Sequence, residues 1–192
     1  NQDILAAICE DVAWLLKKDK EILIVSSGAI ALGKRRINTS SNLTLADSQA
    51  MAAHGQIELM SSWKRKLNKF SIPIGQMLLT PRDTEIKISS QNAKQTVTKL
   101  FQMGCLPIIN ENDSTATDEI KFGDNDLLAA KVAKLVKADL LVVLSTIEGL
   151  YSSQEKIHSK KSGALIKEVS KINAKIKKMA GDASHMGKGG MI

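Results

Sequence analysis

Aromatic residues are scarce in this chain of 192 residues: Phe, Trp and Tyr together make up only 3%. Proteins that bind single-stranded nucleic acid usually stack the bases on aromatic side chains. The net charge of +7 at pH 7 is the one feature shared with basic nucleic-acid-binding domains. Because the surplus lysine is concentrated between residues 156 and 178, one solvated face accounts for it, and we expect no nucleic-acid partner.

Cysteine is equally scarce, since Cys9 and Cys105 are the only two and both lie in apolar segments. They do not form a disulfide framework, and they do not combine with the three histidines at a spacing typical of a metal site. We therefore expect buried, reduced thiols, no protein-bound metal and a cytoplasmic location. The sequence also lacks a secretory signal pattern and an apolar run long enough to cross a membrane, so no membrane partner is expected.

Strand and helix patterns alternate along the chain. Continuous apolar runs typical of strands buried on both faces occupy 22–25, 72–80, 106–109 and 139–144, and a shorter strand is expected at 164–169. Helical spacing covers 3–17, 45–70 with Gly55 as a candidate break, 89–103 and 126–136. This alternation predicts one α/β domain over residues 1–192, a three-layer α-β-α sandwich with a mostly parallel central sheet. Ligands of such sheets bind beyond the carboxyl ends of the strands.

Two polar clusters follow the third expected strand. They are Asn110-Glu111-Asn112-Asp113 and Gly123-Asp124-Asn125-Asp126. An amino-acid ligand would suit them, because its ammonium group pairs with a carboxylate and its carboxylates accept hydrogen bonds from amides. An Asx turn followed by a helix N-cap is the structural alternative, and Mg²⁺ binding by Asp and Asn oxygens is a third.

Three further segments give weaker signals, each with a structural alternative. Ser26-Ser27-Gly28 follows the first strand, where a helix start either binds an anion or is simply capped. Ser145-Thr146 follows the fourth expected strand and either lines a pocket for a flat ring or forms a plain turn. Gly187-Lys188-Gly189-Gly190-Met191 either brings backbone amides close to phosphates or is a flexible tail; it lacks Walker A spacing.

Taken in this order, the segments resemble the glutamate 5-kinases of the amino acid kinase superfamily. The resemblance extends over essentially the whole chain, and its motifs are Ile24–Ile30, Gly75–Thr80, Pro107–Asp113, Phe122–Asp126 and Glu148–Tyr151. It implies the amino acid kinase fold and the use of ATP with Mg²⁺. The implied reaction phosphorylates the γ-carboxylate of L-glutamate to γ-glutamyl phosphate, the first step of proline biosynthesis.

The resemblance also implies roles for individual residues. The expected contacts of glutamate are Ser27, Asn110, Asp113 and Asn125. The expected catalytic residue is Asp126, which would organise two catalytic lysines rather than react. The expected contacts of ATP are Ser145, Thr146, Lys188, Gly189, Gly190 and Met191.

The chain departs from the family pattern in three ways. The family begins with a strand that carries a catalytic lysine and a small-residue phosphate loop, and a second lysine follows the Gly-Gly-Met loop; neither segment occurs in this sequence. Thr146 stands where bacterial relatives tend to have Asp. We therefore expect a domain that is incomplete at both termini, binds its ligands weakly and turns over little.

The expected partners are L-glutamate, ATP, a second copy of the chain in a homo-oligomer, and a glutamyl phosphate reductase that receives the acyl phosphate. Two alternative functions stay open. One is another kinase of the superfamily, acting on acetylglutamate, aspartate or a nucleoside monophosphate. The other is a non-catalytic binding module that contacts RNA through the lysine-rich stretch.

Overall fold

The computed structural model describes residues 2–35, 43–115, 124–145, 149–151, 165–174 and 176. Its elements are, in chain order, α1 (Gln2–Leu16), β1 (Ile24–Val25), α2 (Ala29–Lys34), α3 (Leu45–Leu67), the 3-10 turn η1 (Asn68–Phe70), β2 (Ile74–Leu79), α4 (Pro81–Glu85), α5 (Lys87–Gln102), β3 (Leu106–Glu111), α6 (Asp124–Val136), β4 (Leu150–Tyr151) and β5 (Leu165–Ile166). Within these ranges, no helix combines the length and the apolarity that crossing a membrane requires.

The main sheet is parallel, and its strand order is β1-β3-β2. Its central strand, β3, pairs with both neighbours: Ile108 lies opposite Ile24 of β1 and opposite Gln76 of β2. β4 and β5 form a separate antiparallel pair, with Leu150 opposite Ile166. The mostly parallel sheet predicted from the alternation of strands and helices is confirmed, as is the short strand near residue 165.

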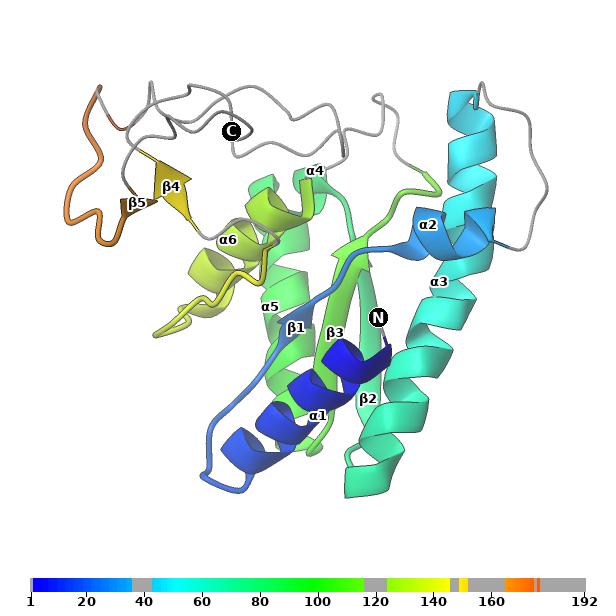
Figure 1. Ribbon diagram of the computed structural model, residues 1–192, viewed down its shortest axis with the longest axis horizontal. Coiled ribbons are helices and arrows are strands. Elements are labelled where there is room, and N and C mark those ends of the chain that lie inside the picture. The colour runs from blue at the N-terminus through cyan, green and yellow to red at the C-terminus, as the bar shows by residue number, and fades with distance from the viewer. Residues whose placement is uncertain are drawn as a thin grey trace.

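Helices cover both faces of the main sheet (Figure 1). Ile108 packs with residues of α1 and α3, whereas the next residue, Ile109, packs with residues of α5 and α6. Successive side chains of a strand point to opposite faces, so the two clusters lie on opposite sides of β3. The structure is therefore the three-layer α-β-α sandwich that the sequence predicts.

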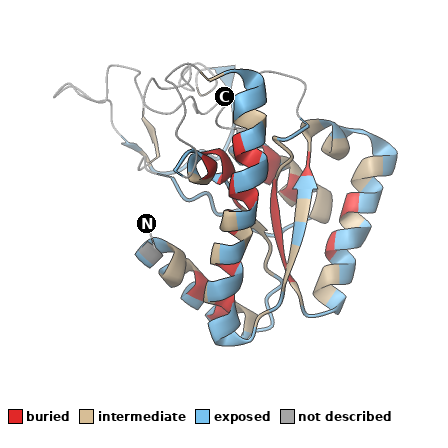
Figure 2. Cartoon of the chain, turned by 90° about the vertical axis from the view of Figure 1, so that its right-hand side faces the viewer, coloured by how far each residue is buried: buried red, intermediate tan, exposed pale blue. Residues whose placement is uncertain are grey.

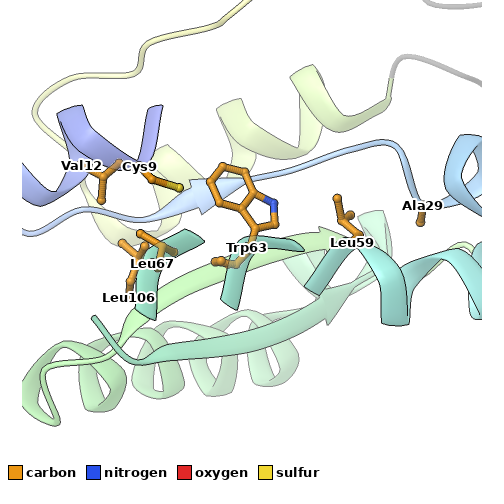
Figure 3. Packing of buried hydrophobic residues seen from close by; sticks show 8 residues of the cluster. Cys9, Val12, Ala29, Leu59, Trp63, Leu67 and Leu106 are labelled. Carbon is orange, nitrogen blue, oxygen red and sulfur yellow. The ribbon is translucent and has the colours of Figure 1, made fainter. Parts of the chain in front are cut away.

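The core is centred on β3, whose residues from Leu106 to Asn110 are all buried between the helices (Figure 2). Each large apolar side chain buried in this way contributes about 1.5–3 kcal/mol to folding. Trp63 of α3 is 5% exposed, and Figure 3 shows its indole in the middle of the cluster, between Cys9 and Leu59. Besides filling the core, this indole places a polar N–H group close to the sheet.

The two cysteines have different environments. Cys9 is fully buried, and its burial raises the pKa of the thiol, which makes it an unreactive core residue. Cys105 is only half-buried, and both thiols are free. The predicted burial is confirmed for Cys9 and only partly confirmed for Cys105.

α2 and α3 approach each other at two glycines. A Cβ atom on Gly55 would lie 1.8 Å from the carbonyl oxygen of Ala29, and one on Gly33 would lie 2.1 Å from that of Met51. No side chain fits in such a contact. The expectation that Gly55 breaks the helix is wrong, because α3 is continuous from Leu45 to Leu67 and uses the glycine for packing.

The fourth strand predicted at 139–144 is not formed. In the described part of the chain this segment pairs with no strand, and its five large apolar side chains are 42–78% exposed. A continuous apolar run predicts a strand only when another strand offers its backbone groups beside it. The segment that follows α6 has no such neighbour among the described residues, so the prediction is wrong.

Candidate functional site

The carboxyl ends of β1 and β3 lie side by side at one edge of the sheet (Figure 1). The backbone N–H of Ser26 donates to the carbonyl of Ile109 over 2.8 Å, so the parallel pairing continues one residue beyond β1. On the other side of β3, the N–H of Asn112 donates to the carbonyl of Leu79 over 2.9 Å. The polar residues at the carboxyl end of β3 therefore lie between the carboxyl ends of β1 and β2.

Ser27 lies at this edge, in the turn that joins β1 to α2. It is exposed, and Gly28 follows it as the N-cap residue of α2 with φ +105°. Residues with a Cβ atom rarely adopt this backbone conformation, so the turn requires glycine at this position. The first predicted contact of glutamate is thus accessible beside the end of β3.

Asn110, in contrast, is 1% exposed, and both polar atoms of its side chain form hydrogen bonds within the protein. Its Nδ2 donates to Oε1 of Gln56 over 2.8 Å, and its Oδ1 accepts from the backbone N–H of Glu111 over 2.9 Å. The structure therefore buries this predicted contact of glutamate, and its side chain binds neighbouring groups of the protein.

Two side chains of α3 bind the strand ends, and the sequence analysis missed both. Gln56 accepts from Asn110 at the end of β3, and the Nε1 of Trp63 donates to Oγ of Ser26, just beyond β1, over 3.1 Å. The two residues are seven positions apart, so they lie on the same face of the helix. The one local signal was Gly55, because a glycine inside a helix usually has a packing reason.

Residues 112–115 form a turn after β3. The hydroxyl of Ser114 donates to Oδ1 of Asn112 over 2.7 Å, and the N–H of Thr115 donates to the carbonyl of Asn112 over 3.2 Å. Asp113 lies inside this turn and is half-buried. The structural alternative of a local turn thus accounts for the side chains of Asn112 and Ser114.

Asn125 and Asp126 lie in the first turn of α6, and their side chains differ in environment. The Oδ1 of Asn125 is shielded from solvent and has no hydrogen-bond partner among the described residues, whereas Asp126 is exposed. Leu128, one turn further, packs in the same cluster as Ile109, so the start of α6 lies near the carboxyl end of β3. A buried acceptor without a donor costs about 1–3 kcal/mol, which a ligand donor such as an ammonium group would offset.

An ion pair joins α6 to α4, the short helix that follows β2. The Nζ of Lys131 lies 2.7 Å from Oε1 of Glu85. Glu85 is 65% exposed, so the pair stabilises the fold by less than about 1 kcal/mol. Because α4 begins directly after β2, the pair connects α6, whose first turn contains Asn125, to the segment that follows the end of β2.

Of the residues expected to bind ATP, Ser145 is the one within the described ranges. Ser145 is exposed and follows the unpaired segment 139–144. Thr146, Lys188, Gly189, Gly190 and Met191 lie outside the described residues. The structure therefore brings together Ser27, Asn110, Asp113 and the start of α6, and the nucleotide half of the site stays a prediction.

A bound metal ion usually needs several convergent ligands. In the ranges that the structure covers, no group of three or more His, Cys, Asp and Glu side chains could hold one. Mg²⁺ that accompanies a nucleotide is bound largely by phosphate oxygens and waters, with only one or two carboxylates. Such an ion needs no preformed protein cage, and the exposed Asp126 has the donor chemistry to take part.

Comparison with known proteins assigns the chain to a family. The amino acid kinase family matches residues 1–192, the whole chain. Among curated proteins, the chain is 47% identical over 189 residues to "Glutamate 5-kinase" of Pelagibacter ubique (strain HTCC1062), which covers 97% of this chain and 51% of that protein. It is 46% identical over 192 residues to "Glutamate 5-kinase" of Agrobacterium fabrum (strain C58 / ATCC 33970), covering 99% of this chain and 49% of that protein.

The chain thus spans about half the length of the curated relatives it matches. The family resemblance predicted from the motifs is confirmed: the chain belongs to the amino acid kinase family.

Proposed function

We propose that the protein transfers the γ-phosphoryl group of ATP to the γ-carboxylate of L-glutamate, forming γ-glutamyl phosphate and ADP, the first step of proline biosynthesis. The identity of 46–47% to relatives named glutamate 5-kinase supports this proposal. This chain covers about half the length of those relatives. The proposed substrate and activity are therefore those of the whole protein.

One structural observation supports a free amino acid as the substrate. The half-buried Asp113 carboxylate and the Oδ1 of Asn125, which has no partner in the part of the chain that the structure describes, belong to two segments that adjoin the same end of β3. Both groups accept hydrogen bonds, and an ammonium group is the donor that a free amino acid offers. In the proposed complex these two residues bind the α-ammonium group, and Ser27 donates its hydroxyl to a carboxylate oxygen.

The reaction needs positioning more than acid–base chemistry. A γ-carboxylate has a pKa of about 4.3 and is already ionised at neutral pH, so no general base is required. One of its oxygens forms a bond to the γ-phosphorus while the bond from that phosphorus to the β–γ bridging oxygen breaks, and ADP leaves with the electron pair. The protein must bring two anions together in line, and positive charge around the moving phosphoryl group lowers the barrier.

The remaining roles in the proposal concern ATP and Mg²⁺. Ser145, Thr146 and the glycine-rich loop Lys188, Gly189, Gly190 and Met191 bind ATP in this proposal, with backbone amides of the loop close to the phosphates. Mg²⁺ neutralises phosphate charge when it is bound with the nucleotide. Asp126 is exposed at the start of α6 and organises cationic side chains rather than reacting.

The proposal extends to location and partners. A cytoplasmic location agrees with the two free cysteines. The proposed partners are a second copy of the chain and a glutamyl phosphate reductase. The reductase is proposed because an acyl phosphate is a reactive product that the next enzyme must consume promptly.

The test is a kinase assay on the purified full-length protein with ATP, Mg²⁺ and hydroxylamine, which converts an acyl phosphate to a hydroxamate. L-Glutamate should give γ-glutamyl hydroxamate and an equal amount of ADP. N-Acetyl-L-glutamate and nucleoside monophosphates should give far less, because they lack the free α-ammonium group that Asp113 binds in the proposal. L-Aspartate should also give far less, because its side chain is one methylene shorter and would not bring its carboxylate to the same point. Faster turnover of any of these substrates would overturn the proposal in favour of another kinase of the superfamily.

A second measurement separates this proposal from the RNA-binding alternative. Phosphate contacts release counterions, so the affinity of a true RNA-binding protein falls steeply as salt is raised. We expect weak RNA binding and unchanged glutamate turnover in the presence of RNA.

A further inference from the structure

The side-chain amides of Gln56 and Asn110 form a buried hydrogen bond between α3 and β3. Gln56 is 8% exposed and Asn110 is 1% exposed. The two residues are 54 positions apart in the chain, and Nδ2 of Asn110 lies 2.8 Å from Oε1 of Gln56. A polar pair in this position needs an explanation, since apolar side chains of similar size would pack there without any polar group to satisfy.

The orientation of both amides follows from one backbone group. The N–H of Glu111 can only donate, so the atom of Asn110 that faces it must be the oxygen Oδ1. Nδ2 of Asn110 then faces Gln56, which must turn its own oxygen toward it. With both amides in these orientations, Nε2 of Gln56 is a buried donor with no partner among the described residues.

A donor left unpaired among the described residues indicates that the pair does not serve stability alone. A methionine at position 56 would remove the unsatisfied N–H of the glutamine, but it would leave Nδ2 of Asn110 without its acceptor. One buried N–H group without a partner is removed and another is created, so the net change in the free energy of unfolding should be small. What the glutamine adds is a fixed orientation of the Asn110 amide.

We infer that Gln56 is a positioning residue, which holds the amide of Asn110 and thereby the polar end of β3 in the arrangement that binds the amino-acid substrate. This inference rests on the proposed function. Neighbouring contacts fix Gln56 itself: Gly55 presses against α2 with no room for a side chain, and Trp63, two turns later on the same face, holds Ser26. α3 thus has one register relative to both strand ends.

The test compares three variants of the full-length protein. Gln56→Met should raise the KM for L-glutamate about tenfold, the effect of losing one well-placed hydrogen bond, and should leave the KM for ATP within about twofold. Gln95→Met makes the same change at an exposed position of α5 and should change neither constant. Gln56→Glu keeps an acceptor oxygen for Asn110 in either protonation state. Its KM for L-glutamate should therefore lie much closer to that of the unmodified protein than to that of Gln56→Met.

A double-variant cycle then asks whether Gln56 acts through Asn110. Asn110→Ala should raise the KM for L-glutamate by itself, and adding Gln56→Met should raise it no further, because the positioned group is already absent. Additive effects, or a Gln56→Met variant indistinguishable from Gln95→Met, would overturn the inference while the proposed function stands. No glutamate-dependent turnover in the unmodified protein would overturn the proposed function and this inference with it.

Discussion

The indole Nε1 of Trp63 donates to Oγ of Ser26 over 3.1 Å, in the interior of the protein. Ser26 directly precedes Ser27, the predicted contact of glutamate at the end of β1. Two turns earlier on the same helix, Gln56 binds Asn110 at the end of β3. One face of α3 therefore holds the carboxyl ends of two neighbouring strands, and it couples the packing of the core to the geometry of the candidate site.

Trp63→Phe should lower the free energy of unfolding by about 1–3 kcal/mol. Phenylalanine keeps much of the apolar contact but removes the N–H, which leaves the buried Oγ of Ser26 without its donor. Urea unfolding of both proteins measures the difference. Trp14→Phe is the matched control, because Trp14 is 61% exposed, and equal losses in the two variants would contradict a role for the hydrogen bond.

Gly55→Ala tests the contact between α2 and α3. Helix propensity alone would make alanine more stable by about 1 kcal/mol. The new Cβ atom would, however, lie 1.8 Å from a backbone oxygen of Ala29 and 2.6 Å from the backbone nitrogen of Gly33, and neither atom can move independently of its helix. We expect a net loss of about 2 kcal/mol or more, seen as a lower midpoint of thermal unfolding.

A second glycine provides the control for that prediction. A Cβ atom on Gly75 would meet the side chain of Leu100 at 2.5 Å, and a leucine side chain can change its rotamer. Gly75→Ala should therefore cost less than Gly55→Ala. The opposite order would show that the α2–α3 contact yields easily and that the register of α3 is not fixed by it.

Asp113→Ala should raise the KM for L-glutamate by about tenfold or more and change the KM for ATP little. The reason is that a charged hydrogen bond to the substrate ammonium is worth about 1.5–3 kcal/mol. Steady-state kinetics with each substrate varied in turn measures both constants. Asp139→Ala, at an exposed position, is the control, and equal effects of Asp113→Ala on both constants would indicate a structural role instead.

The start of α3 should make a pH-dependent contribution to stability. The hydrogen bonds from the side chain and backbone of Thr44 to Asp47 lower the pKa of the Asp47 carboxyl below its ordinary value of 3.8. A lowered folded-state pKa gives stability that is present above 3.8 and is lost as the pH falls through the folded value. Asp47→Asn should therefore be less stable than the unmodified protein at neutral pH.

Thermal unfolding from neutral pH down to about pH 2 measures this difference, which should shrink to nothing once Asp47 is protonated in both states. The effect is modest because Asp47 is exposed. A difference that is constant across the pH range would mean that the carboxylate charge contributes nothing to capping.

Local patterns were sufficient for most of the fold. The apolar runs that became β2 and β3 are flanked by amphipathic helices, and each segment carries its own periodicity. The run at 139–144 has the same composition as a buried strand but lacks a neighbour in the described residues, so composition alone gave the wrong prediction. Strand pairing is a property of two segments, and one segment does not reveal it.

The candidate site was predictable only in part, for the same reason. Asn110 and Asp113 stood out because polar residues directly after a buried strand are unusual, and Asn125 stood out because it belongs to a second polar cluster close behind them. Gln56 and Trp63 did not, because a polar residue in an amphipathic helix looks like any surface residue until the partner 54 or 37 positions away is known. Long-range hydrogen bonds of this kind leave almost no local signal.

The most direct test of the central claim is a crystal structure of the full-length protein with L-glutamate and a non-hydrolysable ATP analogue. The amino acid should lie at the carboxyl ends of β1 and β3, with its ammonium group within hydrogen-bonding distance of Asp113 and of Oδ1 of Asn125 and its γ-carboxylate toward the terminal phosphate. Glutamate bound elsewhere, or a nucleotide on the opposite side of the sheet from these residues, would contradict the proposed site.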